Sequence, residues 1–132
     1  MKTSGVLIVD DEPSLLELAT SFFKCEGIEA CCAADGEEAL RKLRERTFMI
    51  MITDFNMPGM DGLELAEKAR EIAPHMHIVL CSGNISPELP QLAKEAGISE
   101  VFCKPFHLEE ILAMVKKKIA EEKNQASPCA TP

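Results

Sequence analysis

The 132-residue sequence has no tryptophan, no tyrosine and only six phenylalanines. Stacking platforms for single-stranded nucleic acid depend on aromatic side chains, so this class of function is disfavoured. Positive charge is also scarce, because 14 Lys and Arg residues face 22 Asp and Glu residues and leave a net charge of −8. Phosphate backbones and anionic lipids repel such a surface. The composition therefore argues against direct binding to nucleic acid or to a membrane surface.

Long apolar runs and a cysteine framework are missing as well. No apolar run approaches the roughly 18–20 residues of a membrane span. The short apolar patch at residues 5–9 stops at an acidic cluster, unlike a secretory signal. The six cysteines include no CxxC motif, and we expect a cytoplasmic protein with reduced thiols. His75 and His77 could bind zinc, but we favour the alternative that these two residues lie in a surface turn before a strand.

What the sequence does contain is a series of five short apolar runs, at residues 6–9, 28–33, 49–53, 78–81 and 100–103. The first, third and fourth are apolar at nearly every position, which is typical of strands buried on both faces of a parallel sheet. The segments that follow the runs carry apolar residues at helical spacing. This alternation predicts an α/β fold, a flavodoxin-like (βα)5 three-layer sandwich whose five-stranded parallel sheet has the order 2-1-3-4-5.

Capping and breaking residues refine these boundaries. Asp35 followed by Glu38 predicts a capping box at the start of the second helix. Pro90 would remove a hydrogen bond inside the fourth helix, so we predict that this helix starts late or is short. The chain turns polar near its end. We therefore predict one domain over residues 1–122 and a polar, disordered C-terminal tail over residues 123–132.

Polar side chains follow the ends of four of the five predicted strands. These residues are Asp10 and Asp11 after the first strand, Asp54 after the third, Ser82 after the fourth and Lys104 after the fifth. Taken singly, each is more commonly a helix cap, a turn residue or a solvated charge. Ligands of open α/β sheets, however, bind outside the carboxyl ends of the strands. The combination therefore predicts a site at this edge of the sheet.

The charges of this cluster indicate what it binds. Two carboxylates about 4 Å apart repel each other by roughly 4 kcal/mol at an effective dielectric constant near 20. Three converging carboxylates therefore need a cation. Hard oxygen ligands without added histidine or thiolate select Mg²⁺ or Mn²⁺ over zinc. Together with the Lys104 ammonium, such a metal can neutralise a phosphoryl group carried by an aspartate.

Four motifs occur in a characteristic order along the chain: VDDE at residues 9–12, TDFNMPGMDG at 53–62, CSG at 81–83 and CKPF at 103–106. In their order and spacing, the motifs resemble the receiver domain of two-component response regulators. The resemblance extends from about Val6 to Ile119. It implies the flavodoxin-like fold predicted above and a function in phosphorelay signalling.

The resemblance also implies a role for each residue of the predicted site. Asp54 is the expected phosphoacceptor, Ser82 the switch hydroxyl and Lys104 the phosphate-binding lysine. Asp10, Asp11, Asp54 and the backbone carbonyl of Asn56 are the expected ligands of Mg²⁺, with Mn²⁺ as a substitute. The family further implies a cis peptide bond between Lys104 and Pro105, the kind of bond in which the cis form costs least.

The sequence departs from the family at one position. Many receivers carry Tyr or Phe three residues before the lysine, where this chain has Val101, and the aromatic residue is Phe102. A shift of one residue in a strand turns a side chain to the opposite face. We therefore predict that Phe102 packs in the core and that switching proceeds without an aromatic rotamer change.

The function expected from these observations is that of a stand-alone receiver. A sensor histidine kinase or a histidine phosphotransfer protein would transfer a phosphoryl group to Asp54. The output protein would bind the face formed by the fourth helix, fifth strand and fifth helix. The chain would catalyse only its own phosphorylation and dephosphorylation. A Mg²⁺-dependent phosphatase with Asp54 as nucleophile is an alternative that the short loops disfavour. A degenerate receiver used only for binding is another, disfavoured by the complete set of site residues.

Overall fold

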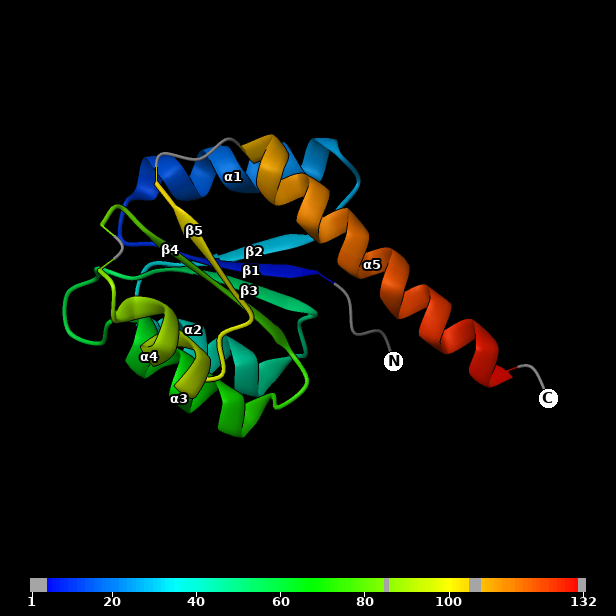
Figure 1. Cartoon of the computed structure of the whole chain (residues 1–132). Coiled ribbons are helices and arrows are strands. Elements are labelled where there is room, and N and C mark those ends of the chain that lie inside the picture. The colour runs from blue at the N-terminus through cyan, green and yellow to red at the C-terminus, as the bar shows by residue number, and fades with distance from the viewer. Residues whose placement is uncertain (1–4, 85, 105–107, 131–132) are drawn as a thin grey trace.

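Five parallel strands form one sheet in the structure, a computed structural model that describes residues 5–84, 86–104 and 108–130. The strands are β1 (Val6–Val9), β2 (Ala30–Ala33), β3 (Ile50–Asp54), β4 (His77–Ser82) and β5 (Glu100–Cys103). Their order in the sheet is β2-β1-β3-β4-β5, as Figure 1 shows. The predicted fold class and strand order are thereby confirmed. Since β1 and β3 are neighbours, the residues that follow them lie side by side.

Five helices cover the two faces of the sheet. They are α1 (Pro13–Cys25), α2 (Gly36–Glu45), α3 (Gly62–Ile72), α4 (Leu89–Glu95) and α5 (Leu108–Ala130). Helices α1 and α5 lie on one face, and α2, α3 and α4 lie on the other (Figure 1). None of the helices in the part of the chain that the structure describes is long and apolar enough to cross a membrane.

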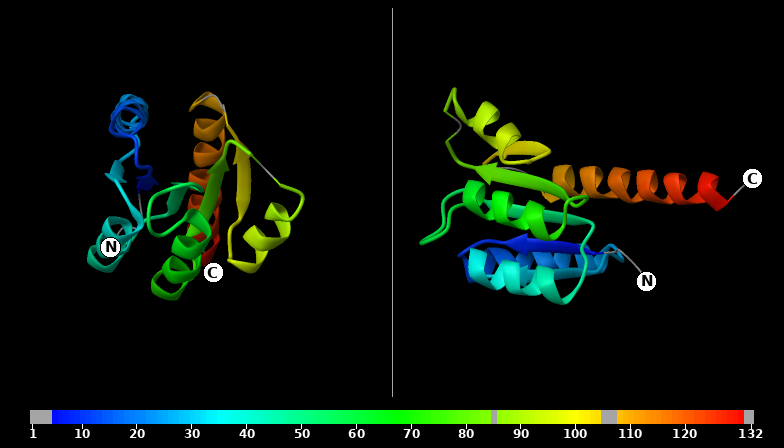
Figure 2. Two further views of the ribbon diagram at one scale, coloured as in Figure 1. Left: turned by 90° about the vertical axis from the view of Figure 1, so that its left-hand side faces the viewer. Right: turned by 90° about the horizontal axis from the view of Figure 1, so that it is seen from below.

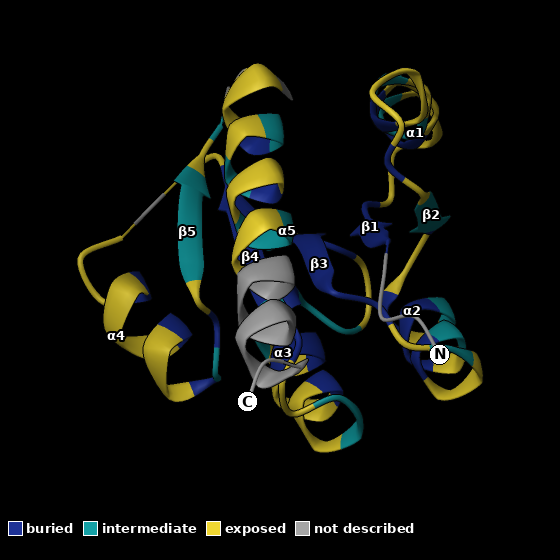
Figure 3. Cartoon of the chain, turned by 90° about the vertical axis from the view of Figure 1, so that its right-hand side faces the viewer, coloured by how far each residue is buried: buried dark blue, intermediate teal, exposed yellow. Residues whose placement is uncertain are grey.

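The core is divided into two apolar clusters by the sheet. In β1, Leu7 and Val9 pack toward α2, α3 and α4, whereas Val6 and Ile8 pack toward α1 and α5. All four side chains are buried, which explains why this strand is apolar at every position. Figure 3 shows β1, β3 and β4 as buried, and the outer strand β5 as only partly so.

The predicted helix starts agree with the structure. The Glu38 N–H donates to Asp35 Oδ1 at 2.8 Å, which confirms Asp35 as the N-cap. Glu38 Oε1 accepts from the Ala34 N–H at 2.8 Å, one residue before the N-cap N–H that a capping box would use. Helix α4 begins only at Leu89, with Pro90 in its first turn. A proline is tolerated there because the first N–H groups of a helix have no intrahelical partner. The late start and short length of α4 are thus confirmed.

At the end of the chain, the backbone of α5 is helical as far as Ala130. No glycine or proline occurs between Leu108 and Ser127, and this stretch is rich in strong helix formers. Local propensity therefore favours a long helix. Among the side chains of α5 that the structure describes, Ile119 is the last that packs against the core. The second half of α5 extends past the sheet in Figures 1 and 2.

The ends of β4 and β5 bring two cysteines onto adjacent strands. In the register of this pair, Cys81 lies opposite Phe102, and Cys103 lies opposite Ser82. Successive side chains of a strand point to opposite faces, so the Cys81 and Cys103 thiols lie on different sides of the sheet. Cys25, Cys31, Cys32, Cys81 and Cys103 are all free thiols. The register therefore excludes the disulfide that strand adjacency alone would suggest.

Candidate functional site

Three carboxylates converge at the carboxyl ends of the two central strands. Asp10 follows β1, Asp11 is next in sequence, and Asp54 is the last residue of β3. One oxygen from each lies within 4.8 Å of the others. Asp10 is buried, Asp54 is half-buried and Asp11 is exposed. The strand order thus brings together the acids that the sequence predicted.

Lys104 adds a positive charge to the cluster. Its Nζ lies 2.8 Å from Asp54 Oδ1 and 3.5 Å from Asp10 Oδ2. The backbone N–H of Lys104 donates to the Ser82 carbonyl at 2.8 Å, which extends the pairing of β4 and β5 by one residue. This bond fixes the backbone from which the lysine reaches toward the acids.

Burial sets the electrostatics of Asp10. Desolvation raises the pKa of this carboxyl above its usual value, although the Glu12 N–H donates to Oδ1 at 3.0 Å and Lys104 lies nearby. The folded protein therefore holds this proton more tightly than the unfolded chain does. The contribution of Asp10 to stability is consequently lost as the pH rises from its ordinary pKa through the raised one. Further positive charge in the site would favour the ionised form of Asp10.

The opposing effects on Lys104 leave it more basic than usual. Burial lowers the pKa of the ammonium, but the hydrogen bond and the negative charge of Asp54, with the charge of Asp10, outweigh burial and raise it. Lys104 therefore stays protonated at neutral pH and is a fixed cation beside the Asp54 carboxylate.

A cavity of about 30 Å³ lies beneath these charged groups. Asp10, Asp54 and Lys104 meet there with apolar side chains, among them Phe23 and Ile111. The Cys81 thiol also lines the cavity, and burial raises its pKa to about 12. A thiol held in this protonated form is a poor nucleophile, so the acids are the reactive groups of the site.

Ser82 ends β4 with its side chain completely buried. Its Oγ donates to the Asn84 carbonyl at 3.0 Å and accepts from the Asn84 N–H at 3.2 Å. The hydroxyl is therefore bound to the loop that leads toward α4. The sequence analysis predicted Ser82 as a site residue but missed its partner Asn84. Serine side chains often form hydrogen bonds with the backbone two residues further on, and this tendency was the available signal.

Thr53 is a second contributor that the sequence analysis missed. It is fully buried, and its Oγ1 donates to the Asp54 carbonyl at 3.0 Å. A hydroxyl residue within an otherwise apolar strand was the available signal. Its contact stabilises the backbone of the residue that carries the central carboxylate.

The loop between β3 and α3 is held against the same end of the sheet. The Phe55 N–H donates to the Cys81 carbonyl at 2.8 Å, and the Gly62 N–H donates to the Phe55 carbonyl at 2.9 Å. Asn56, whose carbonyl is a predicted metal ligand, lies exposed at the start of this loop. A Cβ atom on Gly62 would lie 2.6 Å from both the Asp54 carbonyl oxygen and Leu80 Cδ1. Glycine is thus required where α3 approaches the backbone of Asp54.

Replacing Gly62 by Ala is therefore expected to destabilise the protein by about 1–3 kcal/mol, the usual cost of inserting an atom into a packed region. Gly83→Ala is the matched control, because a Cβ there has no atom within 4 Å. Urea unfolding of both variants measures the difference. Equal midpoints for the two variants would show that the close approach of α3 is not required.

The two hydrophobic residues before Lys104 lie on opposite faces of the sheet, as predicted. Phe102 packs against the α1 and α5 cluster, and Val101 packs against the α2, α3 and α4 cluster. Phe102 is thus partly buried and packs against the core. The predicted cis bond between Lys104 and Pro105 lies outside the described residues.

The donor set of the site fits a hard divalent cation. The available ligands are carboxylate oxygens. The group of side chains whose ligand atoms lie within 4.8 Å of one another consists of three aspartates, without a histidine or a cysteine. Such ligands suit Mg²⁺ or Mn²⁺. His75 and His77 contribute nothing to this cluster, and His77 Nε2 lies 2.9 Å from Glu100 Oε2.

The fold and the acidic site together define a class of signalling domain. Residues 6–116 match the response regulator receiver domain. The chain therefore belongs to the response regulator receiver domain family of two-component systems. Receiver domains interact with histidine kinases or phosphotransfer proteins, and they generally use Mg²⁺.

Named relatives resemble the chain over most of its length. Sporulation initiation phosphotransferase F of Bacillus subtilis is 30% identical over 94% of this chain and 100% of its own. The uncharacterized transcriptional regulatory protein YesN of the same organism is 32% identical over 91% of this chain, which spans only 33% of YesN. The crystal structure of a CheY-like receiver domain protein from Methanospirillum hungatei JF-1 superimposes with a TM-score of 0.87. It is 30% identical and covers 94% of this chain and 99% of its own.

Proposed function

We propose that this chain is a phosphorylatable receiver in which Asp54 accepts a phosphoryl group from a phosphohistidine in a Mg²⁺-dependent reaction. The observation that carries the proposal is the position of Asp54, between two further acids and 2.8 Å from the Lys104 ammonium. A carboxylate at this point can be both a nucleophile and a carrier of added negative charge. Family membership supports this assignment.

The transfer requires only groups at this edge of the sheet. An oxygen of Asp54 attacks phosphorus, and the bond from phosphorus to the donor nitrogen breaks as the new oxygen–phosphorus bond forms. The nitrogen keeps the electron pair and is protonated as the neutral imidazole departs. The Asp54 Oδ2 atom makes no hydrogen bond to any residue that the structure describes, whereas Oδ1 accepts from Lys104. Oδ2 is therefore the oxygen we assign as the nucleophile.

Lys104 and a bound cation would share the charge of the product. Asp10, Asp11, Asp54 and the Asn56 carbonyl would hold Mg²⁺, which supplies positive charge opposite the transferred phosphoryl oxygens. Lys104 already contacts Asp54 and can shift its hydrogen bond to a phosphoryl oxygen. Ser82 would donate to another oxygen after releasing Asn84.

Mg²⁺ is expected to raise the Tm of the unphosphorylated protein, because it relieves repulsion among the three acids. At ten times its Kd, one bound ion adds about 1.4 kcal/mol, or about 5 °C for a domain of this size. Asp11→Asn should reduce this increase, whereas Asp35→Asn, at an exposed acid outside the site, should retain it. Calorimetry with and without a chelator measures the effect. An unchanged Tm in millimolar Mg²⁺ and Mn²⁺ would contradict the metal assignment.

The size of the cavity beside the acids favours a receiver over a phosphatase. Its volume of about 30 Å³ is only a few times the roughly 10–15 Å³ that one water molecule requires, so the cavity is too small to enclose a small-molecule ester. We therefore propose that the chain catalyses only its own phosphorylation and dephosphorylation. A small phosphodonor should give one label per chain with slow decay. Continuous turnover of a phosphate ester would instead identify a hydrolase.

The proposed output face consists of α4, β5 and α5. Ser82 connects the site to this face through its two hydrogen bonds to Asn84, five residues before α4 begins. The exposed Leu92 of α4 offers an apolar contact there. The partners would be a histidine kinase or phosphotransfer protein and an output protein, in the cytoplasm, without direct contact to nucleic acid or membrane.

We further propose that the receiver domain ends near residue 122. The family match ends at residue 116, and Ile119 is the last residue of α5 that packs against the core among the side chains that the structure describes. Deletion of residues 123–132 should therefore leave the Tm and the phosphorylation rate unchanged. Calorimetry and labelling of the shortened chain test the boundary. A substantial drop in Tm would show that the end of α5 belongs to the folded unit.

A further inference from the structure

The strand β2 lies at one edge of the sheet. Such a strand exposes N–H and C=O groups with which a strand of another chain can pair. The N–H groups of Val6 and Asp10 donate to the carbonyls of Glu29 and Ala33 at 2.9 and 3.1 Å. Because backbone groups alternate between the two sides of a strand, Cys32 and Ala34 turn theirs away from β1, toward the open edge.

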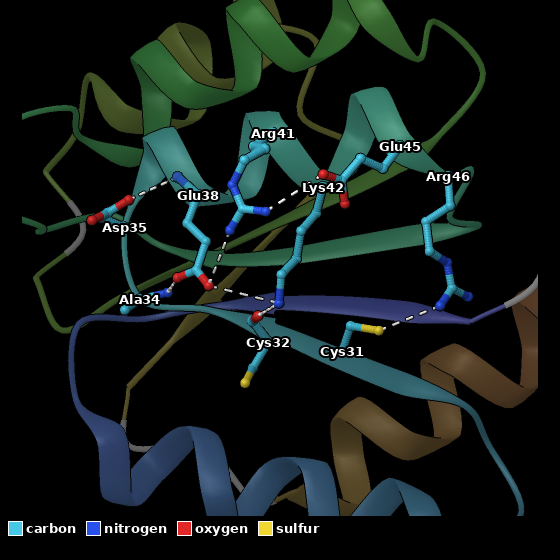
Figure 4. Close-up of polar contacts among 9 residues, drawn as sticks. All are labelled: Cys31, Cys32, Ala34, Asp35, Glu38, Arg41, Lys42, Glu45 and Arg46. Atoms are coloured by element: carbon cyan, nitrogen blue, oxygen red, sulfur yellow. Dashed lines mark hydrogen bonds and ion pairs between the residues drawn. The ribbon is translucent and has the colours of Figure 1, made fainter.

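Two side chains of α2 form hydrogen bonds with backbone groups on this open edge, as Figure 4 shows. Lys42 Nζ donates to the Cys32 carbonyl at 2.5 Å, and Glu38 Oε1 accepts from the Ala34 N–H at 2.8 Å. Lys42 and Glu38 are one helical turn apart, with Nζ and Oε2 separated by 3.7 Å. The outward carbonyl of Cys32 is therefore bound by the Lys42 ammonium, and the outward N–H of Ala34 is bound by the Glu38 carboxylate.

We propose that Glu38 and Lys42 form an edge latch that prevents β2 from pairing with β2 of a second copy of this chain. The sequence of the strand, ACCA, has neither a charge nor a proline to discourage such pairing. The strand itself therefore carries no charge that would repel a copy of the same strand. Antiparallel pairing about a twofold axis would also be self-complementary. Protection of this edge therefore comes from the neighbouring helix.

The same helix supplies a matched control. Arg41 and Glu45 form an ion pair of the same type, with Nη1 and Oε2 3.5 Å apart, but their side chains are 58% and 61% exposed. Arg41 Nη2 also lies 3.8 Å from Glu38 Oε2, but within the described part of the chain neither Arg41 nor Glu45 makes a hydrogen bond to β2 (Figure 4). Removing either pair leaves the net charge at −8, so the two changes differ in their effect on the edge.

The test compares Glu38→Ala/Lys42→Ala with Arg41→Ala/Glu45→Ala by sedimentation velocity over a range of concentrations. We expect the first variant to shift toward a species of twice the mass of the native one as concentration rises, and the second to sediment like the native protein. Hydrogen exchange locates the contact. The Cys32 amide of the first variant should exchange more slowly in concentrated than in dilute solution.

Two single substitutions guard against a folding defect. Lys42→Met keeps the Glu38 contact with Ala34 and makes the net charge of the chain more negative. Because copies of this variant repel each other more strongly, any association that it shows cannot result from reduced charge repulsion. Lys42→Arg keeps a donor for the Cys32 carbonyl and should behave like the native protein. The proposal is overturned if Glu38→Ala/Lys42→Ala and Lys42→Met keep the circular dichroism spectrum of the native protein and also sediment like it. It is equally overturned if they associate without slower exchange at Cys32.

Discussion

Replacing Asp54 by Asn is expected to reduce phosphoryl incorporation from about one group per chain to background. The amide keeps the shape of the side chain but removes the negative charge and the nucleophilic oxygen. Lys104 Nζ, now 2.8 Å from Asp54 Oδ1, would retain a hydrogen-bond acceptor, so the fold should persist. Intact-protein mass spectrometry after incubation with a small phosphodonor and Mg²⁺ measures the loss.

The control for this experiment is Asp61→Asn. Asp61 caps α3 by accepting from the Glu64 N–H at 2.9 Å, and asparagine caps helices about as well. This variant should therefore label like the native protein. Full labelling of Asp54→Asn would place the acceptor on another residue, and loss of labelling in Asp61→Asn would show that the assay reports general damage.

The second large effect concerns Ser82→Ala, which is expected to separate phosphorylation from the conformational response. Labelling of Asp54 should continue, because Ser82 Oγ bonds Asn84 and makes no contact with the acids. A phosphoryl group can shift the protein between two states only through contacts that differ between them. The Ser82 hydroxyl provides such a contact, since it must leave Asn84 to reach the phosphoryl group.

Amide chemical shifts upon addition of Mg²⁺ and beryllofluoride, a phosphoryl mimic, measure this coupling. In the native protein the changes should extend from the acids through Asn84 to residues 86–96. In Ser82→Ala they should stay near the acids, whereas Ser82→Thr, which retains a hydroxyl, should restore them. Val101→Ala should have little effect. Changes that reach α4 undiminished in Ser82→Ala would contradict this route.

Elements that depend on short-range patterns could be predicted from the sequence. The central strand β1 is apolar at every position, and the Asp35 cap and Pro90 mark helix starts. The apolar run at 28–33 was less informative, because β2 begins only at Ala30. The Ile28 N–H instead donates to the Phe23 carbonyl at 2.9 Å, following Gly27 with a φ of +77°. The run thus joins the apolar end of a helix to a strand.

In the candidate site, too, some features could be predicted from the sequence and others could not. The convergence of Asp10, Asp54 and Lys104 follows from strand order, because the ends of neighbouring parallel strands meet at one edge. Contacts that depend on side-chain orientation could not be read in this way. The bond between Ser82 and Asn84 and the buried contact of Thr53 with Asp54 require the folded loop and strand. The edge latch is likewise a tertiary contact, although Glu38 and Lys42 have ordinary helical spacing.

The central claim, that the three acids and Lys104 form a Mg²⁺-dependent phosphoacceptor site on Asp54, is tested most directly by a crystal structure with Mg²⁺ and beryllofluoride. The account predicts beryllofluoride bonded to Asp54 within hydrogen-bond distance of Lys104 Nζ. It also predicts one Mg²⁺ bound by the acids and the Asn56 carbonyl, with Ser82 Oγ turned from Asn84 toward a fluoride. A well-ordered crystal with the adduct on another carboxylate, or with no metal among the three acids, would contradict it.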